Sequence, residues 1–303
     1  MSSINVEHIS KHFKQVTALD DISFSVDRCE LFGFIGPDGA GKTTLFRILT
    51  TLLVPDKGRA SVNGLDVVKD YRKIRQDIGY MPGRFSLYTD LSVEENLNFY
   101  ATVFGTTVAE NYDLIRDIYV QIEPFKKRKA GKLSGGMKQK LALSCALIHK
   151  PSVLILDEPT TGVDAVSRLE FWEMLKRLKQ SGITIIVATP YMDEAGLCDR
   201  VALIQAGKIM AISTPSEVIK MYPWKLFSVK SDDIFSLLQD LKQFPRAHTV
   251  YAFGQAAHLS SREGDVNEAV ISGYLGSRGH KGLQVNAIQS NIEDCFMELM
   301  IKT

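Results

Sequence analysis

One glycine-rich stretch, residues 36–44, carries the residue types needed to bind phosphate groups. Its sequence, GPDGAGKTT, fits the phosphate-binding pattern G-x-x-x-x-G-K-[ST]. Glycines let the backbone curl so that several N–H groups point at one anion, and the lysine adds a positive charge near the β- and γ-phosphates of a nucleotide. The threonine after the lysine can offer its hydroxyl to Mg²⁺. The predicted nucleotide-binding residues are Gly36, Pro37, Gly39, Ala40, Gly41, Lys42, Thr43 and Thr44.

The segments on either side of this loop have the order that a phosphate site requires. Residues 31–35 form a short apolar run, LFGFI, which predicts a buried strand. Residues 44–53 place apolar side chains at helical spacing, which predicts a helix that begins at the end of the loop. The N-terminus of that helix would add a positive dipole end to the site. The alternative is a glycine-rich loop that only turns a strand into a helix.

Two adjacent carboxylates, Asp157 and Glu158, follow the apolar run of residues 153–156. An aspartate at the tip of an apolar strand is where phosphate-loop enzymes place a carboxylate that holds Mg²⁺, so Thr43 and Asp157 are the predicted metal ligands. Glu158 is placed to polarise a water molecule as a general base, which makes it the predicted catalytic residue. The alternative is a pair of surface carboxylates, but a phosphate loop already demands a carboxylate on the metal side.

The composition is that of an ordinary globular protein, with 303 residues of which 45% are hydrophobic and 23% charged. The formal net charge of +1 gives no overall attraction to nucleic acids or acidic membranes. The four cysteines are widely scattered, which favours a reduced, cytoplasmic setting and no cysteine metal site. No apolar run approaches the roughly 18 residues of a spanning helix, and no signal-peptide segment is present. We therefore expect a protein that does not itself cross a membrane.

Strands alternate with helices through the first two thirds of the chain. Several of the strands, including residues 153–157 and 182–188, are continuously apolar, which predicts an α/β fold with a parallel sheet covered on both faces. Residues 4–9 and 19–26 alternate apolar and polar side chains and predict half-buried strands. A helix is expected from about residue 138 to residue 149.

The last part of the chain has a different order of elements. After the Tyr-Pro-Trp sequence at residues 222–224, the pattern predicts strand, helix, strand, strand, helix and strand, followed by an extra helix. This is the β-α-β-β-α-β order of ferredoxin-like folds. We therefore predict a nucleotide-binding domain over residues 1–221 and a small α+β domain over residues 222–303, without a catalytic constellation in the second.

In combination, these motifs resemble the ATP-binding cassette (ABC) family over residues 4–215. Residues 36–44 resemble its Walker A loop, and residues 154–158 its Walker B strand. Residues 133–137, LSGGM, resemble the family signature, which in such ATPases reaches across a dimer to the partner's γ-phosphate. The resemblance thus assigns this role in trans to Ser134, Gly135 and Gly136.

Two further positions take their roles only from the resemblance. Asp164 ends the sequence TGVD, which resembles the D-loop. Phe13 falls where the family carries the aromatic that stacks on adenine, although an aromatic in such a strand is often a core residue. The resemblance also implies a fold with a mainly parallel sheet core, an antiparallel β subdomain and a helical subdomain.

Two parts of the chain look most like the drug-exporter type of ABC protein: the residues that follow the signature glycines, and the C-terminal module. This implies hydrolysis of ATP with Mg²⁺ as cofactor, a second ABC ATPase subunit, and separate membrane-spanning permease subunits for a drug-like or lipid-like substrate. Such a subunit lies at the cytoplasmic face of the inner membrane. No nucleic-acid partner is expected, because the two cassettes, coiled-coil insertions or zinc cysteines of ABC proteins that act on ribosomes or DNA are missing.

Two positions depart from the family pattern. Gly83 stands where family members usually carry glutamine, and Pro190 where they usually carry histidine. The resemblance implies that the missing glutamine would hold Mg²⁺ and the attacking water, and that the missing histidine would contact the γ-phosphate. One hypothesis is a slow site whose intact signature completes a competent site on another subunit. The alternatives are a homodimer with local substitutes such as Arg84, and a non-hydrolytic regulatory subunit.

An aromatic segment directly after Gly83 is a candidate contact with a membrane subunit. Residues 85–88, FSLY, lie where the family docks the coupling helix of its permease. An apolar patch of this kind could equally belong to the local core.

Overall fold

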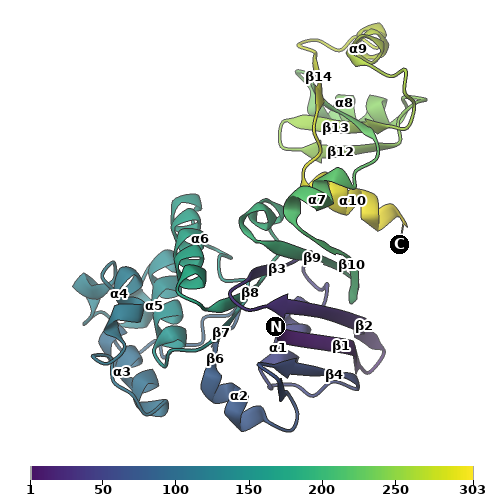
Figure 1. Ribbon diagram of the computed structural model, residues 1–303. Helices are drawn as coiled ribbons and strands as arrows, with labels where there is room; N and C mark the ends of the chain where they lie inside the picture. Colours follow the sequence, from purple (N-terminus) through teal and green to yellow (C-terminus); the bar gives the residue numbers. More distant parts are fainter. Residues whose placement is uncertain (1, 303) are drawn as a thin grey trace. The chain divides into compact units, whose positions relative to one another are not determined.

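The structure is a computed structural model that describes residues 2–302. The chain divides into two compact units, one up to Pro215 and the other from Ser216 (Figure 1). This division falls at the start of helix α7 (Pro215–Lys220), whereas the sequence pattern placed the boundary just after that helix. Within the described residues, no helix combines the length and the apolar character needed to cross a membrane.

The first unit is built on a six-stranded sheet with a parallel core. Its order is β10-β9-β3-β8-β7-β6, and all neighbouring strands run parallel except the edge strand β10, which pairs antiparallel with β9. The central strands are apolar throughout because both faces of the sheet are covered. The strands are β3 (Leu31–Ile35), β6 (Ile78–Met81), β7 (Val153–Asp157), β8 (Thr184–Thr189), β9 (Arg200–Gln205) and β10 (Lys208–Ser213).

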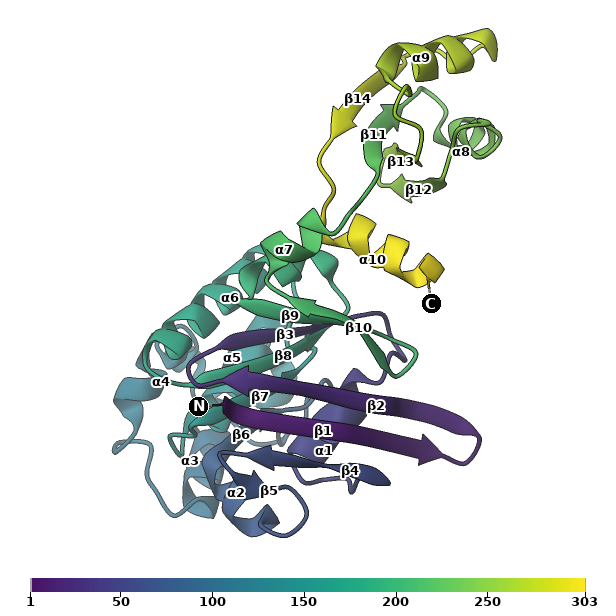
Figure 2. The same cartoon turned by 45° about the vertical axis from the view of Figure 1, so that its right-hand side comes forward.

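A second, antiparallel sheet belongs to the same unit and has the order β2-β1-β4-β5. Helix α1 (Lys42–Leu49) packs against strands of both sheets (Figure 2). Its apolar side chains belong to one core together with those of both sheets. The core explains the alternating pattern of the long strands, because only one of their faces is buried. The strands are β1 (Ser2–Phe13), β2 (Val16–Asp27), β4 (Lys57–Val62) and β5 (Leu65–Asp66).

Helices form the remaining part of the first unit. Helix α6 packs on β3 and β8, and α5 contacts α3, α4 and β6. A capping box formed by Ser92 and Glu95 starts α3. The helices are α2 (Tyr71–Asp77), α3 (Val93–Val103), α4 (Tyr112–Tyr119), α5 (Gly135–Leu147) and α6 (Ala165–Gln180). These elements and the two sheets confirm the α/β fold, the antiparallel β part and the helical part.

Helix α5 begins three residues earlier than the sequence pattern indicates. Two glycines are poor helix formers, so periodicity alone places the start after them. The hydroxyl of Ser134 accepts a hydrogen bond from the backbone N–H of Met137 (3.3 Å) and caps the helix. Gly135 and Gly136 therefore form its first turn.

The second unit is a four-stranded antiparallel sheet with the order β12-β13-β11-β14. Helices α8 and α9 share one apolar core with one face of this sheet. Strand order and helix placement confirm the ferredoxin-like order, with α10 as the extra helix. The elements are β11 (Lys225–Lys230), α8 (Ile234–Lys242), β12 (Thr249–Phe253), β13 (Ala256–Ser261), α9 (Glu268–Ser277), β14 (Gln284–Ile288) and α10 (Ile292–Lys302).

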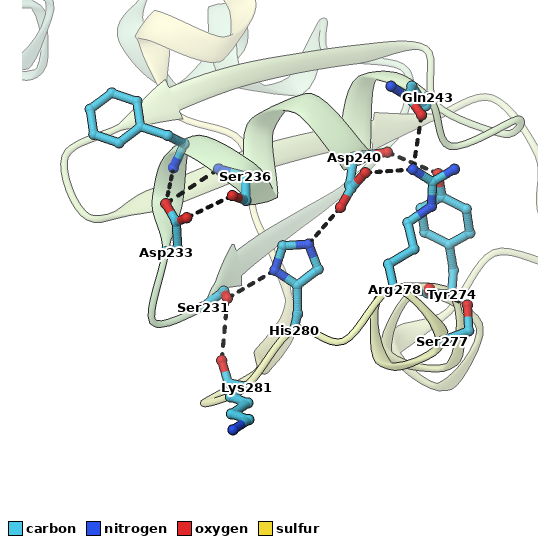
Figure 3. A network of polar contacts seen from close by, with 11 residues as sticks. Ser231, Asp233, Ser236, Asp240, Gln243, Tyr274, Ser277, Arg278, His280 and Lys281 are labelled. Carbon is cyan, nitrogen blue, oxygen red and sulfur yellow. Dashed lines mark hydrogen bonds and ion pairs between the residues drawn. The ribbon is translucent and has the colours of Figure 1, made fainter.

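The second unit contains a network of polar contacts around His280 and Asp240 (Figure 3). The imidazole of His280 contacts the Ser231 hydroxyl through Nδ1 (3.1 Å) and the Asp240 carboxylate through Nε2 (2.9 Å). Arg278 also donates a hydrogen bond to Asp240. Hydrogen bonds from His280 and Arg278 lower the pKa of the Asp240 carboxyl group. The network therefore ties the end of β11 and helix α8 to the segment that follows α9.

Candidate functional site

The glycine-rich loop connects β3 to α1 and is fixed by close backbone approaches. A Cβ atom at Gly36 would lie 2.1 Å from the carbonyl oxygen of Ile204 in β9. Gly41 has a φ of +106°, and a Cβ atom there would lie 2.4 Å from the carbonyl oxygen of Ala18 in β2. At Gly36 there is no space for a side chain, and at Gly41 the left-handed backbone adds a second reason why only glycine fits. The loop is thus held between strands of the two sheets.

The ammonium group of Lys42 lies inside this loop. The residue is only 3% exposed, and its ammonium group donates hydrogen bonds to the carbonyl oxygens of Gly36 (2.7 Å) and Pro37 (3.0 Å). Its Nζ lies 3.7 Å from Oε1 of Glu158. Burial lowers the pKa of Lys42, although the neighbouring carboxylates favour its charged form. The lysine is therefore positioned by the backbone that would surround a phosphate group.

The two predicted metal ligands meet at the start of α1. The hydroxyl of Thr43 donates a hydrogen bond to Oδ1 of Asp157, over 3.1 Å. Asp157 is 3% exposed, and burial raises the pKa of its carboxyl group while the bond from Thr43 opposes the rise. Hydroxyl and carboxylate oxygens are the ligands that Mg²⁺ prefers, and a cation here would favour the charged form of Asp157. The donor set therefore fits Mg²⁺.

Glu158 has an unusual backbone for a residue with a side chain. Its φ is +51°, in the left-handed region, and its backbone N–H donates to the carbonyl oxygen of Ala188 in β8 (2.8 Å). Its side chain is 23% exposed and faces Lys42. This conformation at the end of β7 gives the carboxylate access to the phosphate loop and to water.

A cavity of about 160 Å³ lies beside Lys42, Thr43 and Glu158. Glu158 and the loop residues Gly39 to Thr44 line it, together with Val16, Thr17 and Ala18 of β2. No motif marks Thr17 or Ala18 in the sequence; they reach the site because β2 passes directly beside Gly41. Phe13 pairs with Val16 across the β1–β2 turn and is 46% exposed. Phe13 thus lies next to a lining residue without lining the cavity itself.

The two positions that depart from the family pattern lie close to this cavity. A Cβ atom at Gly83 would lie 3.1 Å from the carbonyl oxygen of Asp157 and 3.7 Å from Cβ of Glu158. Pro190 directly follows Thr189, whose carbonyl oxygen accepts a hydrogen bond from the backbone N–H of Gly36 (3.3 Å). Both positions therefore border the carboxylates or the loop, but neither supplies a polar side chain.

The signature and the D-loop form a second group at the N-termini of α5 and α6. Asp164 caps α6 by accepting a hydrogen bond from the backbone N–H of Ser167 (3.0 Å). A Cβ atom at Gly136 would lie 2.8 Å from Oγ of the same serine. This second group does not line the cavity at the phosphate loop; its members are Ser134, Gly135, Gly136 and Asp164. Within one chain, the structure thus brings together the Walker A and B residues but not the signature.

Comparison with known proteins places these features in a family. The sequence profile of the ABC transporter family matches residues 19–161. The chain is 42% identical over 217 residues to the probable multidrug ABC transporter ATP-binding protein YbhF of Escherichia coli (strain K12). That match covers 71% of this chain but only 38% of YbhF, so the chain spans well under half of that relative.

Other relatives match along nearly their whole length. The chain is 33% identical over 303 residues to the Nod factor export ATP-binding protein I of Burkholderia lata, covering 99% of this chain and 97% of that protein. Among solved structures, one described as the ATP binding subunit of an ABC transporter superposes with a TM-score of 0.66 at 27% identity, covering 72% of this chain and 92% of the other. The chain therefore belongs to the ATP-binding proteins of the ABC transporter family.

Proposed function

We propose that the chain is the ATP-binding and ATP-hydrolysing subunit of an exporter whose membrane-spanning permease subunits are separate chains. The observation that carries this proposal is that Lys42, Thr43 and Glu158 line one cavity at the phosphate loop, and that Thr43 is hydrogen-bonded to Asp157 behind it. The relatives are named for multidrug transport and for Nod factor export. A drug-like or lipid-like molecule is the class of substrate that these names suggest.

Each side chain of the site has a role that follows from its chemistry. The loop backbone and Lys42 bind the phosphate groups, because they supply N–H donors and a fixed positive charge. Thr43 and Asp157 would hold Mg²⁺, which neutralises phosphate charge when it is bound. Glu158 accepts a proton from the attacking water. We assign adenine stacking to Phe13, which is exposed beside the cavity.

A second ABC ATPase subunit completes the proposed site. In this arrangement, the signature residues Ser134, Gly135 and Gly136, together with Asp164, act on the nucleotide of the partner; in support, none of them lines the cavity at this chain's own phosphate loop. Gly83 and Pro190 leave this chain's own site without two polar contacts, and each lost contact to a transition state costs on the order of 10²–10³ in rate. We therefore propose a slow site of its own and a partner that is a different ATPase subunit.

A non-hydrolytic, regulatory subunit is the second candidate function. The glycine at position 83 and the proline at position 190 favour it, because both remove side chains that assist hydrolysis elsewhere in the family. The geometry of Glu158 opposes it, since its carboxylate still faces Lys42 across 3.7 Å. Turnover at this chain's own site, alone or with a partner subunit, would exclude the regulatory candidate.

The experiment that tests the proposed function measures Mg-ATP binding and phosphate release by the purified chain. The control is Lys42→Ala, which removes the charge held inside the loop and should weaken binding by at least about 100-fold, as expected for a buried charge-assisted contact. Turnover by the wild-type chain alone supports a self-sufficient ATPase. Tight binding without turnover supports a site that depends on another subunit. Absence of Mg-ATP binding in the wild-type chain would refute the proposal.

We place the permease contact at an apolar cavity of about 290 Å³ behind the aromatic segment of residues 85–88. Phe85 and Leu87 line this cavity with residues of α3 and α5, and the exposed Tyr88 ring packs edge-on against Phe99. Docking there would hold the chain at the cytoplasmic face of the inner membrane as a peripheral subunit. Phe85→Asp should then release the chain from membrane proteins in co-purification, because it places a charged group in an apolar contact. Unchanged co-purification, with Phe235→Asp as a control at an exposed aromatic that does not line this cavity, would argue against this contact.

A further inference from the structure

Glu194 is a buried carboxylate outside the groups assigned above. It lies in the 3₁₀ segment η3 (Met192–Leu197) and is only 1% exposed. Its Oε1 accepts a hydrogen bond from the hydroxyl of Thr160 (2.8 Å), and its Oε2 accepts one from the hydroxyl of Thr189. Nε of Arg168, on α6, lies 3.9 Å from Oε1. A carboxylate is costly to bury unless it is paired and hydrogen-bonded, and this one meets both conditions.

The two threonines belong to the segments that carry the nucleotide site. Thr160 follows Glu158 by two residues, and Thr189 ends β8. The carbonyl oxygen of Thr189 accepts the hydrogen bond from Gly36, and its hydroxyl accepts one from the backbone N–H of Tyr191 (3.1 Å), across Pro190. Both threonine side chains are buried. One carboxylate therefore joins the segment after β7, the end of β8 and, through the Thr189 backbone, the first residue of the phosphate loop.

The connection matters because the backbone of Glu158 is left-handed, with a φ of +51°. Such a conformation in a residue other than glycine persists only where its neighbours hold it in place. Glu158 is held on one side by its bond to Ala188 in β8. On the other side, the backbone N–H of Thr161 donates to the Glu158 carbonyl oxygen (3.3 Å), and the Thr160 side chain is tied to Glu194. The Thr161 hydroxyl also donates a hydrogen bond to Oε2 of Glu158 (3.5 Å), so the bond between Thr160 and Glu194 is one of two side-chain contacts at this turn, and the only one of the two that reaches the buried carboxylate.

We infer that Glu194 is a positioning residue for ATP hydrolysis, which holds Thr160 and Thr189 so that the Glu158 carboxylate keeps facing the phosphate loop. The inference rests on the proposed function, because it takes Glu158 as the general base. Glu194 does not line the cavity at the phosphate loop, so it acts on the rate and not on nucleotide affinity. A small displacement of a catalytic group lowers the rate steeply.

The test compares Glu194→Gln with the matched control Asp193→Asn. Asp193 is the neighbouring acid; its side chain is 65% exposed and pairs with Arg168, and among the described residues it is hydrogen-bonded to neither threonine. Glutamine keeps the shape of Glu194 but replaces one accepting oxygen with an NH₂ group, so one threonine hydroxyl must accept a hydrogen bond instead of donating one, and the negative charge that faces Arg168 is lost. We expect kcat to fall by roughly 10- to 100-fold while KM and the Kd for Mg-ATP stay within about 2-fold of wild type. Asp193→Asn should retain the wild-type kcat.

Two further measurements separate positioning from a general loss of structure. Thr160→Val should reproduce the fall in kcat, and Thr160→Ser, which keeps the hydroxyl, should restore most of it. Hydrogen–deuterium exchange at the amides of Glu158, Thr160 and Thr161 should become at least about 10-fold faster in Glu194→Gln, because the buried side-chain anchor of that turn is weakened. This readout needs no turnover.

The outcomes distinguish this inference from the proposed function. Wild-type kcat and wild-type exchange in Glu194→Gln would overturn the role of Glu194 and leave the proposed function standing. A Kd for Mg-ATP that rises as much as kcat falls would also overturn it, since it would indicate a collapsed site. A wild-type chain that does not bind Mg-ATP would refute the proposed function, while the exchange measurement would still decide whether Glu194 holds the turn.

Discussion

Replacing Glu158 with glutamine should lower ATP turnover by roughly 10²- to 10⁴-fold, the range that a positioned general base contributes, while Mg-ATP binding stays at the wild-type level. Glutamine has nearly the same shape, so the left-handed backbone and the bond to Ala188 can remain. The amide cannot take a proton from the attacking water. Phosphate release in a single turnover, beside the Kd for Mg-ATP, measures the two quantities separately.

A matched control for this variant is Glu173→Gln on the exposed side of α6. Glu173 pairs with Lys176 one helical turn away and does not line the cavity at the phosphate loop. It should retain the wild-type rate. If Glu158→Gln also retained it, Glu158 would not be the base, and Glu158 would act only as a partner of Lys42.

Replacing Gly36 with alanine should weaken Mg-ATP binding by at least about 100-fold, an effect typical of losing several aligned contacts to one ligand. The added Cβ atom would lie 2.1 Å from the carbonyl oxygen of Ile204, and backbone atoms of β9 cannot move away as a flexible side chain could. The loop must shift instead, which displaces the N–H groups aimed at the phosphates and the carbonyl oxygen that holds Lys42. Isothermal titration with Mg-ATP measures this loss.

Gly39→Ala provides the comparison within the same loop. Gly39 has a φ of +79° but no heavy atom within 4 Å of an added Cβ, so its cost is the backbone strain of about 1–2 kcal/mol alone. Gly39→Ala should therefore weaken binding much less than Gly36→Ala does. Equal losses in the two variants would show that backbone conformation, rather than the approach to Ile204, determines the loop.

Most of the fold and the composition of the candidate site could be predicted from the sequence, because their signals are local. The phosphate loop is nine consecutive residues between an apolar run and a helical pattern, and Asp157 and Glu158 end the next clearly apolar run. The ferredoxin-like order of the second unit is likewise visible as a succession of short periodic segments. The catalytic and binding roles of these residues stay predictions that the experiments above test.

The remaining parts of the site depend on contacts between distant segments, which no spacing reveals. Ala18 reaches the cavity because β2 passes beside Gly41, and Ile204 limits Gly36 from the neighbouring strand β9. Glu194 looks like an ordinary surface acid in the sequence, yet its hydroxyl partners come from the ends of two other segments. Periodicity predicts the start of α5 three residues too late, because the capping contact of Ser134 outweighs the low helix propensity of the glycines that follow.

Each unit of the chain has its own hydrophobic core, one joined by α1 and the other by α8 and α9. Chains of this kind unfold in more than one cooperative step, so a single free energy of unfolding does not describe them. A nucleotide that binds only the folded first unit raises the melting temperature of that unit by mass action. In a calorimetric scan, the ferredoxin-like unit therefore serves as an internal reference, against which the stabilisation by Mg-ATP can be read in the same molecule.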